Sequence, residues 1–235
     1  FPISIINQKA LSYSKKDFVS GTLKEAEGLI DALVDAVDTE SNDPSFDAYI
    51  KQNFLDNLLR GGYPLIFGEG EHKKIYHVYS RKHGDPERDY NFFTLAPEFY
   101  SQGNGNYRDV NQNRRNDVFF VPEAGLFNVK MFMNLIQLDG YNPLGVQGTT
   151  FTLEQAVAEK IIEKYVLSNQ DKLREVFKSK FTPGKISMQI LLGEIELTVS
   201  EETFIGLVIA ESNQHVEAFY GEGFWVDHWT YNFDL

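Results

Sequence analysis

The stretch GNGNYRDVNQNRRNDVFF, residues 103–120, contains five asparagines, three arginines and two aspartates between aromatic residues. Arg108 and Asp109 are neighbours in it, and Arg114 and Arg115 follow. A carboxylate beside a guanidinium stays ionised and can accept hydrogen bonds from hydroxyl groups, while the arginine donates in a fixed fork. Side-chain amides both donate and accept. The stretch therefore has the chemistry to bind a ligand that is rich in hydroxyl groups.

The same residues allow a second interpretation, in which they form a buried hub of ion pairs that ties several loops together. Burial of so many polar groups requires every one of them to be paired. Under the first interpretation, aromatic side chains of the stretch would offer flat apolar faces to sugar rings: Tyr107, Phe119 and Phe120. The residues alone leave both interpretations open.

Composition and charge restrict the partners of the chain. It has 235 residues, a formal net charge of -12 and no cysteine. Nucleic acids are bound by clustered lysines and arginines, so the acidic balance argues against them and suits a neutral sugar. No apolar run approaches the roughly 20 residues that span a bilayer, so we expect no membrane partner. The lack of cysteine fits a reducing compartment, and we expect a cytoplasmic protein.

Motifs for several other chemistries are missing from the sequence. The five histidines show no metal-binding spacing with each other or with carboxylates, so we expect no metal site. There is no Gly-x-Ser-x-Gly nucleophile motif. The glycine-rich segments GEGEHKK and GNGN fit neither of the phosphate-loop templates.

The hydrophobic pattern predicts a chain made mainly of helices. Thr22 and Glu25 form a capping box at the start of an apolar stripe, and Thr152 and Gln155 form another. Ser200 is a further expected helix cap. The predicted helices cover residues 22–37, 44–60, 127–138, 152–166, 170–181 and 200–212.

Strands are expected to be few. The segment KKIYHVYS, residues 73–80, alternates as a short strand would, and residues 184–197 fit either a strand or a helix. Long aromatic loops join the predicted helices, and long loops in a compact domain usually carry a function. Helices with such loops at one end indicate a helical barrel with its site at that end.

Both ends of the chain suggest a piece of a longer protein. Phe1-Pro2 is an unusual start, and the final segment WTYNFDL stops inside an apolar-periodic pattern. A complete barrel of twelve helices of about twelve residues each, with loops, needs more residues than this chain has. We therefore expect the 235-residue chain alone to be inactive.

One segment resembles a known family. NYRDVNQNRRNDVFFVPE, residues 106–123, is similar to the Arg-Asp-x-x-Gln-Asp loop of the family 94 glycoside phosphorylases, the cellobiose and chitobiose phosphorylase group. In that family Val-Pro-Glu and a helix follow the loop, as they do here in VPEAGLFNVKMFMNLIQ. Residues 43–60 resemble the opening helix of the family's catalytic domain, and GEGFWVDHW, residues 221–229, resembles a later segment.

The resemblance implies a fold class and a domain organisation. The fold would be mainly α, a partial (α/α)6 barrel with long loops and a small β element. Residues 1–40 would form a linker helix region, and residues 41–149 would start the catalytic domain. Residues 150–220 look like an insertion of unknown role, after which residues 221–235 would continue the catalytic domain.

The resemblance also implies a reaction. The family members are inverting disaccharide phosphorylases, which transfer a glycosyl unit from a β-glucoside to inorganic phosphate as co-substrate and use no other cofactor. Arg108 and Asp109 would bind hydroxyls of the donor sugar, and Gln112 would support them. Tyr107 and Trp225 would contact the substrate as aromatic faces, although core packing is the alternative for Trp225. Whether the full-length protein is a homodimer stays open.

Two departures from the family pattern bear on phosphate. The family has a phosphate-binding arginine shortly before the Arg-Asp pair, where this chain has Gln102 and Gly103. Arg114 or Arg115 would have to bind phosphate instead. Asn113 stands where the motif ends in aspartate. Two alternatives therefore stay open: a non-catalytic carbohydrate-binding or scaffold module, and a glycoside hydrolase on the same barrel.

The general acid is the third open point. The family's acid lies in a Trp-x-Asp segment, which the triplet at 225–227 mimics, so Asp227 is a candidate. Its position fits an earlier family segment better, and the acid is then expected beyond Leu235. A hydrolase would need a second carboxylate as base.

Overall fold

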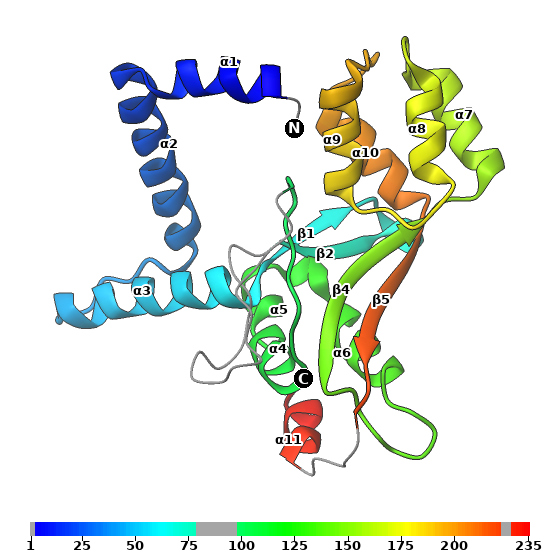
Figure 1. The fold of residues 1–235 in the computed structure, drawn as a ribbon. Coiled ribbons are helices and arrows are strands. Elements are labelled where there is room, and N and C mark those ends of the chain that lie inside the picture. Colours follow the sequence, from blue (N-terminus) through cyan, green and yellow to red (C-terminus); the bar gives the residue numbers. More distant parts are fainter. Residues whose placement is uncertain (1–2, 79–97, 222–226) are drawn as a thin grey trace. The chain divides into compact units, whose positions relative to one another are not determined.

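The computed structural model describes residues 3–78, 98–221 and 227–235. The chain divides into two compact units, Phe1–Asn57 and Leu58–Leu235. The described part is mainly helical and contains two small antiparallel sheets (Figure 1). The predicted mainly α class is confirmed. Within the described residues, no helix combines the length and the apolar character needed to cross a membrane.

The first unit consists of helices. They are α1 (Ile3–Tyr13), α2 (Lys16–Val34), the 3-10 turn η1 (Asp35–Val37) and most of α3 (Pro44–Gly61). The predicted capping box at Thr22 is wrong, because α2 begins earlier and Thr22 lies inside it. Asp17 stands in the first turn of α2, where a negative charge interacts favourably with the helix dipole. Apolar side chains of α2 are exposed, among them Leu23 and Leu29.

The start of α3 agrees with the predicted helix over 44–60. The Asp43 carboxylate accepts a hydrogen bond from the backbone N–H of Ser45 at 2.9 Å, and Pro44 is the first helical residue. An Asp cap followed by proline is a preferred way to begin a helix. The Asp47 carboxylate accepts a second backbone bond, from Ser41 at 3.1 Å, which folds the preceding turn onto the helix.

The second unit contains both sheets. Strand β1 (Tyr63–Phe67) pairs antiparallel with β2 (Lys74–Val78), which confirms the predicted short strand. A three-stranded sheet has the order β3-β4-β5, formed by β3 (Gly105–Asn106), β4 (Gly145–Thr152) and β5 (Asn213–Phe219). None of these three strands was predicted, and neither was β1. A bulge between Val146 and Gly148 interrupts the alternation of β4, and such a bulge hides a strand from a period-2 pattern.

Four helices lie between β4 and β5, and we call them the helical insert. They are α7 (Gln155–Tyr165), α8 (Gln170–Phe177), α9 (Pro183–Gly193) and α10 (Glu201–Ala210). The chain enters the insert from β4 and leaves it on β5, and these strands are antiparallel neighbours (Figure 1). The ends of the insert therefore lie side by side. The insertion predicted over residues 150–220 would begin within β4 and end just after β5. These domain boundaries stay a prediction.

Two helix caps were predicted in this part of the sequence, at Ser200 and at Thr152. Ser200 caps α10 by accepting from the N–H of Thr203 at 3.2 Å, as predicted. The predicted box at Thr152 is wrong, because Thr152 ends β4 and its hydroxyl lies 2.8 Å from His215 Nε2 on β5. Residues 184–197, which fitted a strand or a helix, lie mostly in α9.

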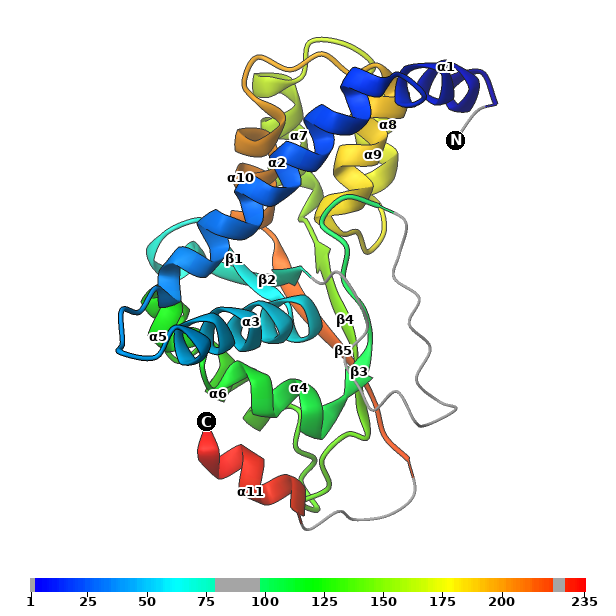
Figure 2. The ribbon, with the colours of Figure 1, turned by 90° about the vertical axis from the view of Figure 1, so that its left-hand side faces the viewer.

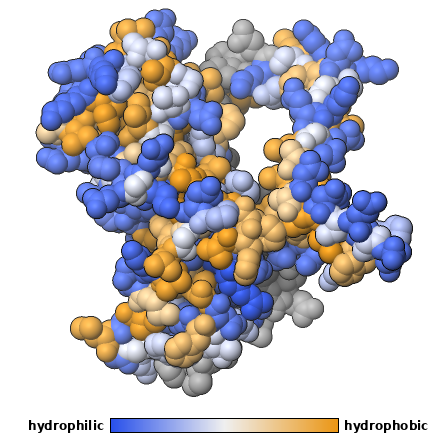
Figure 3. Space-filling view, turned by 180° about the vertical axis from the view of Figure 1, so that it is seen from behind, coloured by the Kyte–Doolittle hydropathy of each residue, from blue (hydrophilic) through white to orange (hydrophobic). Residues whose placement is uncertain are grey.

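The main core joins the helical insert to the sheets. Fully buried aromatic residues stand at its centre, and Figure 3 shows hydrophilic residues interspersed with hydrophobic ones over the outer surface of the insert. The aromatic members of this core are Phe67, Tyr76, Phe151, Phe177, Phe181 and Phe204. A separate small cluster packs beside β4 and consists of Tyr107, Val110, Phe132 and Val146.

The second unit also contains helices outside the insert, some of which contribute residues to the small cluster. They are α4 (Tyr107–Arg114), α5 (Asp117–Phe120), α6 (Phe127–Asn134) and α11 (Asp227–Asp234), with 3-10 turns at Gly70–His72 and Pro122–Ala124. Helix α6 is shorter than the predicted 127–138. In both Figure 1 and Figure 2, α11 lies below α4. These helices carry the residues of the candidate site.

Candidate functional site

Helix α4 sorts the polar residues of the 103–120 stretch onto two faces. Its buried residues are Tyr107, Val110, Asn111 and Arg114, a spacing that puts them on one face of a helix. Arg108, Asp109 and Gln112 lie outside that stripe. A binding face and a buried hub were alternatives for the sequence. The structure has a buried polar hub on one side of α4 and leaves Arg108 and Gln112 exposed on the other, so the binding face stays a prediction.

The outer face carries the Arg108–Asp109 pair. Arg108 Nε donates to Asp109 Oδ1 at 3.2 Å, and Asn106 Nδ2 donates to Asp109 Oδ2 at 3.2 Å. The Arg108 side chain is 44% exposed and that of Asp109 is 14% exposed. Neighbours thus fix the direction of both carboxylate oxygens; the guanidinium is exposed, and the carboxylate is largely covered but not fully buried. The two groups are not sealed in a core.

The neighbouring candidates Gln112 and Arg115 are also exposed. Arg115 Nη1 forms an ion pair with Asp234 Oδ2 on α11 at 3.3 Å, and both side chains are more than 40% exposed. Arg114, the residue before Arg115, is only 2% exposed. The structure therefore does not bring Arg114 and Arg115 together into one anion-binding group.

The inner face of α4 borders a buried polar hub. His77 Nε2 on β2 lies 2.9 Å from Asp117 Oδ2 on α5, and Asn128 Nδ2 on α6 donates to the same oxygen at 2.9 Å. Asn128 Nδ2 also donates to the carbonyl of Arg114 at 3.2 Å. The Arg114 guanidinium reaches the Gly62 carbonyl at 3.5 Å. The hub thus links β2, α4, α5 and α6 with Gly62, the residue before β1.

Electrostatics fix the protonation states in the hub. Burial lowers the pKa of His77 to about 4, with a contribution from the Arg114 charge and despite the opposing effect of Asp117. For Asp117, burial alone would raise the pKa, but the hydrogen bond with His77 and the Arg114 charge lower it below its ordinary value. At neutral pH a neutral imidazole therefore faces an ionised carboxylate, and Arg114 balances that charge.

A second buried group connects α4 to α11. Tyr107 OH donates to Asn232 Oδ1 at 2.8 Å, and Asn111 Nδ2 donates to the same oxygen at 2.6 Å. Asn232 is 2% exposed and Asn111 is fully buried. Burial raises the pKa of Tyr107 to about 12, so its hydroxyl keeps its proton. Tyr107 is therefore a core residue rather than an exposed face for a sugar ring.

Gln102 has a structural role at the position where the family resemblance places a phosphate-binding arginine. Its Nε2 donates to the Thr149 carbonyl at 2.7 Å, and its Oε1 accepts from the Thr149 N–H at 2.8 Å. The side chain thus pairs with the backbone of β4 as a neighbouring strand would. It lies against the bulge, because a Cβ at Gly148 would approach it to 3.1 Å.

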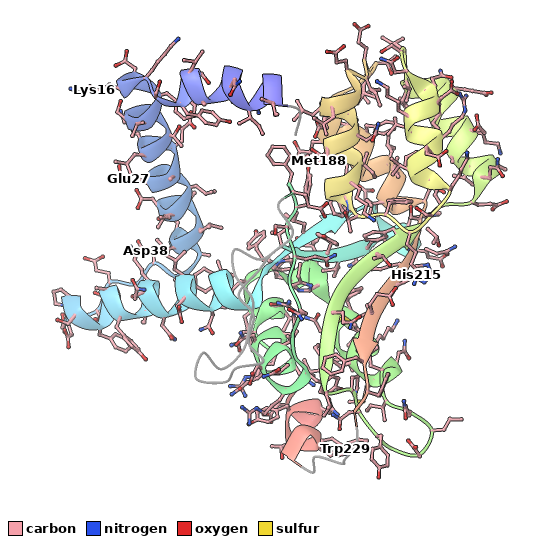
Figure 4. All side chains as sticks on the ribbon, in the orientation of Figure 1. Lys16, Glu27, Asp38, Met188, His215 and Trp229 are labelled. Atoms are coloured by element: carbon pink, nitrogen blue, oxygen red, sulfur yellow. The ribbon has the colours of Figure 1, made fainter. Side chains whose placement is uncertain are left out.

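The aromatic candidates lie in different environments. Phe119 is 76% exposed and Phe120 is 40% exposed on α5. Trp229, labelled in Figure 4, is half-buried on α11, with its ring centroid 5.9 Å from that of Phe233. Trp225 lies outside the described residues. Helix α11 begins at Asp227, the candidate acid.

Comparisons with known proteins give no relative for this chain. No family model, no curated protein and no solved structure matches it. Among the described residues, no group of three or more His, Asp or Glu side chains could hold a metal ion. The site must therefore be interpreted from its own geometry.

Sequence reasoning missed three residues of the site: His77, Asn128 and Asn232. His77 belongs to a strand whose central residues are buried on both faces, so alternation alone could not assign its side. Asn128 stands at helical spacing among apolar residues, and an amide on an apolar face is a usable sign of a buried polar contact. Asn232 lies 121 residues from Asn111, and no local pattern connects them.

Proposed function

We propose that this chain is part of a carbohydrate-active enzyme resembling the inverting disaccharide phosphorylases. In this enzyme α4 supplies the subsite for the donor sugar, and the reaction transfers a glycosyl unit from a β-glucoside to phosphate. The observation that carries the proposal is the outer face of α4, where Asn106 and Arg108 hold the Asp109 carboxylate beside solvent.

Asp109 has the acceptor capacity that a sugar requires. An ionised carboxylate offers about four lone-pair positions, and the bonds from Asn106 and Arg108 use one on each oxygen. Hydroxyl groups of a sugar could donate to the others, in charge-assisted bonds roughly twice as strong as neutral ones. Because the carboxylate is already oriented, little conformational entropy is lost when the sugar binds.

The proposal also includes a barrel and a phosphate site. The helices before and after the 103–120 stretch would form part of an (α/α)6 barrel. Arg115 is the better candidate for phosphate, because it is exposed while Arg114 is buried. An inverting mechanism also needs an acid to protonate the leaving oxygen while phosphate attacks from the opposite face. Asp227, or a residue after Leu235, would be that acid.

One observation favours a second candidate, a module that binds carbohydrate without phosphorolysis. Gln102 occupies the position of the expected arginine and is engaged by the backbone of Thr149 through both ends of its amide. Because the Gln102 side chain is used for these structural bonds, this position does not supply a phosphate-binding group. Under this second candidate, the Arg108–Asp109 face still binds a sugar, but the protein does not transfer a glycosyl unit to phosphate.

Sugar binding is tested by titrating cellobiose into the chain and observing backbone amide signals of residues 106–112 by NMR. We expect these signals to shift in the native chain and in Glu163→Gln, a control that removes an exposed helical carboxylate from α7. We expect no shift in Asp109→Asn, because an amide in place of the carboxylate loses the charge-assisted bonds. Equal responses of the two variants would contradict the proposal.

Turnover separates the two candidates. In the full-length protein, phosphate-dependent release of glucose 1-phosphate from a β-linked disaccharide supports the phosphorylase. Binding without any product, with or without phosphate, supports the binding module. Phosphate-independent release of glucose would indicate a hydrolase and would contradict both.

A further inference from the structure

Helix α11 is joined to α4 through a single buried amide. Asn232 Oδ1 accepts from Tyr107 OH at 2.8 Å and from Asn111 Nδ2 at 2.6 Å. The two donors stand four residues apart on the buried face of α4, so they lie one helical turn from each other. One oxygen on α11 therefore fixes two points along the axis of α4.

The other contacts of α11 are less specific. Phe233 is 79% exposed and the Arg115–Asp234 ion pair is exposed on both sides, where such pairs contribute little. Leu235 packs on the small cluster around Tyr107. Apolar packing tolerates small shifts of one helix along another, whereas two hydrogen bonds to one atom do not.

The buried amides of Asn111 and Asn232 also lower the stability of the fold, which indicates that they serve another purpose than stability. Asn111 Oδ1 and Asn232 Nδ2 are fully buried, and neither has a hydrogen-bond partner among the described residues. An unpaired buried polar group destabilises a fold. Buried asparagines between helices are known to specify register at such a cost in stability.

We infer that Asn232 is a positioning residue, which sets the register of α11 against α4. It thereby fixes the Arg108–Asp109 pair relative to Asp227, the residue at which α11 begins. For a saccharide subsite this inference rests on the proposed function. A displacement of about 1 Å at such a site can change rates or binding by up to about a hundredfold.

The direct test observes the geometry of α4 without any ligand. In Asn232→Leu, which has similar volume and no acceptor, we expect the NMR signal of Arg108 Nε–H to move. We expect no movement in Asp234→Asn, a matched control that changes only the exposed ion pair of α11. Asn232→Asp keeps an acceptor oxygen, so we expect its Arg108 Nε–H signal to stay at the native position. If Asn232→Leu does not fold, Asn111→Ala removes one of the two donors and should also move the signal.

The second arm measures the dissociation constant of cellobiose for the same folded variants. We expect a rise of about tenfold in Asn232→Leu and less than about twofold in Asn232→Asp and Asp234→Asn. An unchanged Arg108 signal in folded Asn232→Leu or Asn111→Ala overturns the inference. A native chain that binds no cellobiose overturns the proposed function instead, and the Arg108 signal still decides the role of Asn232.

Discussion

His77 and Asp117 form a buried hydrogen bond of 2.9 Å that joins a strand to a helix forty residues later. Both side chains are less than a tenth exposed. The imidazole is neutral and the carboxylate is ionised, because burial lowers the pKa of His77 to about 4 while His77 and Arg114 lower that of Asp117. The bond therefore depends on pH.

Acid should weaken the fold in two steps. In the unfolded chain His77 binds a proton near its ordinary pKa of 6.5, but in the folded chain only near 4. The stabilisation it contributes is thus present above pH 6.5 and is lost as pH falls from 6.5 to 4. It amounts to about 3 kcal/mol at most. Asp117 adds a loss at lower pH, as pH falls through its lowered folded pKa. The free energy of unfolding, measured by urea denaturation from pH 7 to pH 4, checks the first step.

A pair of histidine variants isolates the contribution of His77. His77→Gln keeps a donor toward Asp117 but has no titrating group, so the decline between pH 6.5 and pH 4 should become shallower. His72→Gln removes an exposed histidine, whose ion pair with Glu211 is also exposed and contributes little, so the slope should stay nearly unchanged. Equal slopes in the native chain and in His77→Gln would show that His77 is not buried as a neutral group.

The adjacent arginines should differ in their effect on stability. Arg114→Met removes a buried charge and leaves the ionised Asp117 without its counter-charge, which should cost about 3–5 kcal/mol. Arg115→Met breaks an exposed ion pair and should cost less than about 0.5 kcal/mol. Chemical denaturation of both variants at pH 7 measures the difference. Similar losses would mean that Arg115 belongs to the hub or that Arg114 does not.

The sequence predicted the helices better than the strands, for physical reasons. Apolar periodicity and caps such as Ser200 act within one turn, so they can be recognised locally. The start of α2 was missed because neither cap nor apolar residue marks Lys16. Strand β4 was missed because its bulge breaks the alternation and its partner β5 follows only after the whole helical insert.

The candidate site was half predictable. The pairing of Arg108 with Asp109 could be predicted because the two are neighbours in the sequence, and the structure shows it at 3.2 Å; their role in sugar binding stays a prediction. The separation of Arg114 from Arg115 follows from the phase of α4, which required knowledge of its start at Tyr107. The roles of His77 and Asn232 depend on contacts over long sequence distances, which one sequence does not contain.

Gln102 should contribute to stability through its two bonds to the Thr149 backbone. Gln102→Ala loses both, and at about 1 kcal/mol each the expected loss is about 2 kcal/mol. Gln147→Ala, an exposed glutamine on the same strand β4, should change stability by less than about 0.5 kcal/mol. Thermal unfolding of both variants provides the comparison. A small effect at Gln102 would leave that position available for phosphate binding.

Two helical glycines of the insert should respond to alanine with opposite signs. A Cβ on Gly184 in α9 would lie 2.2 Å from the carbonyl oxygen of Phe99, so the backbone would have to move, at a cost of about 2 kcal/mol. A Cβ on Gly206 in α10 meets nothing within 4 Å, and alanine there should stabilise the helix by about 0.5–1 kcal/mol. Helix propensity alone would predict stabilisation at both positions. Denaturation midpoints of Gly184→Ala and Gly206→Ala therefore test whether the segment at Phe99 packs directly on α9, and a stable Gly184→Ala would show that it does not.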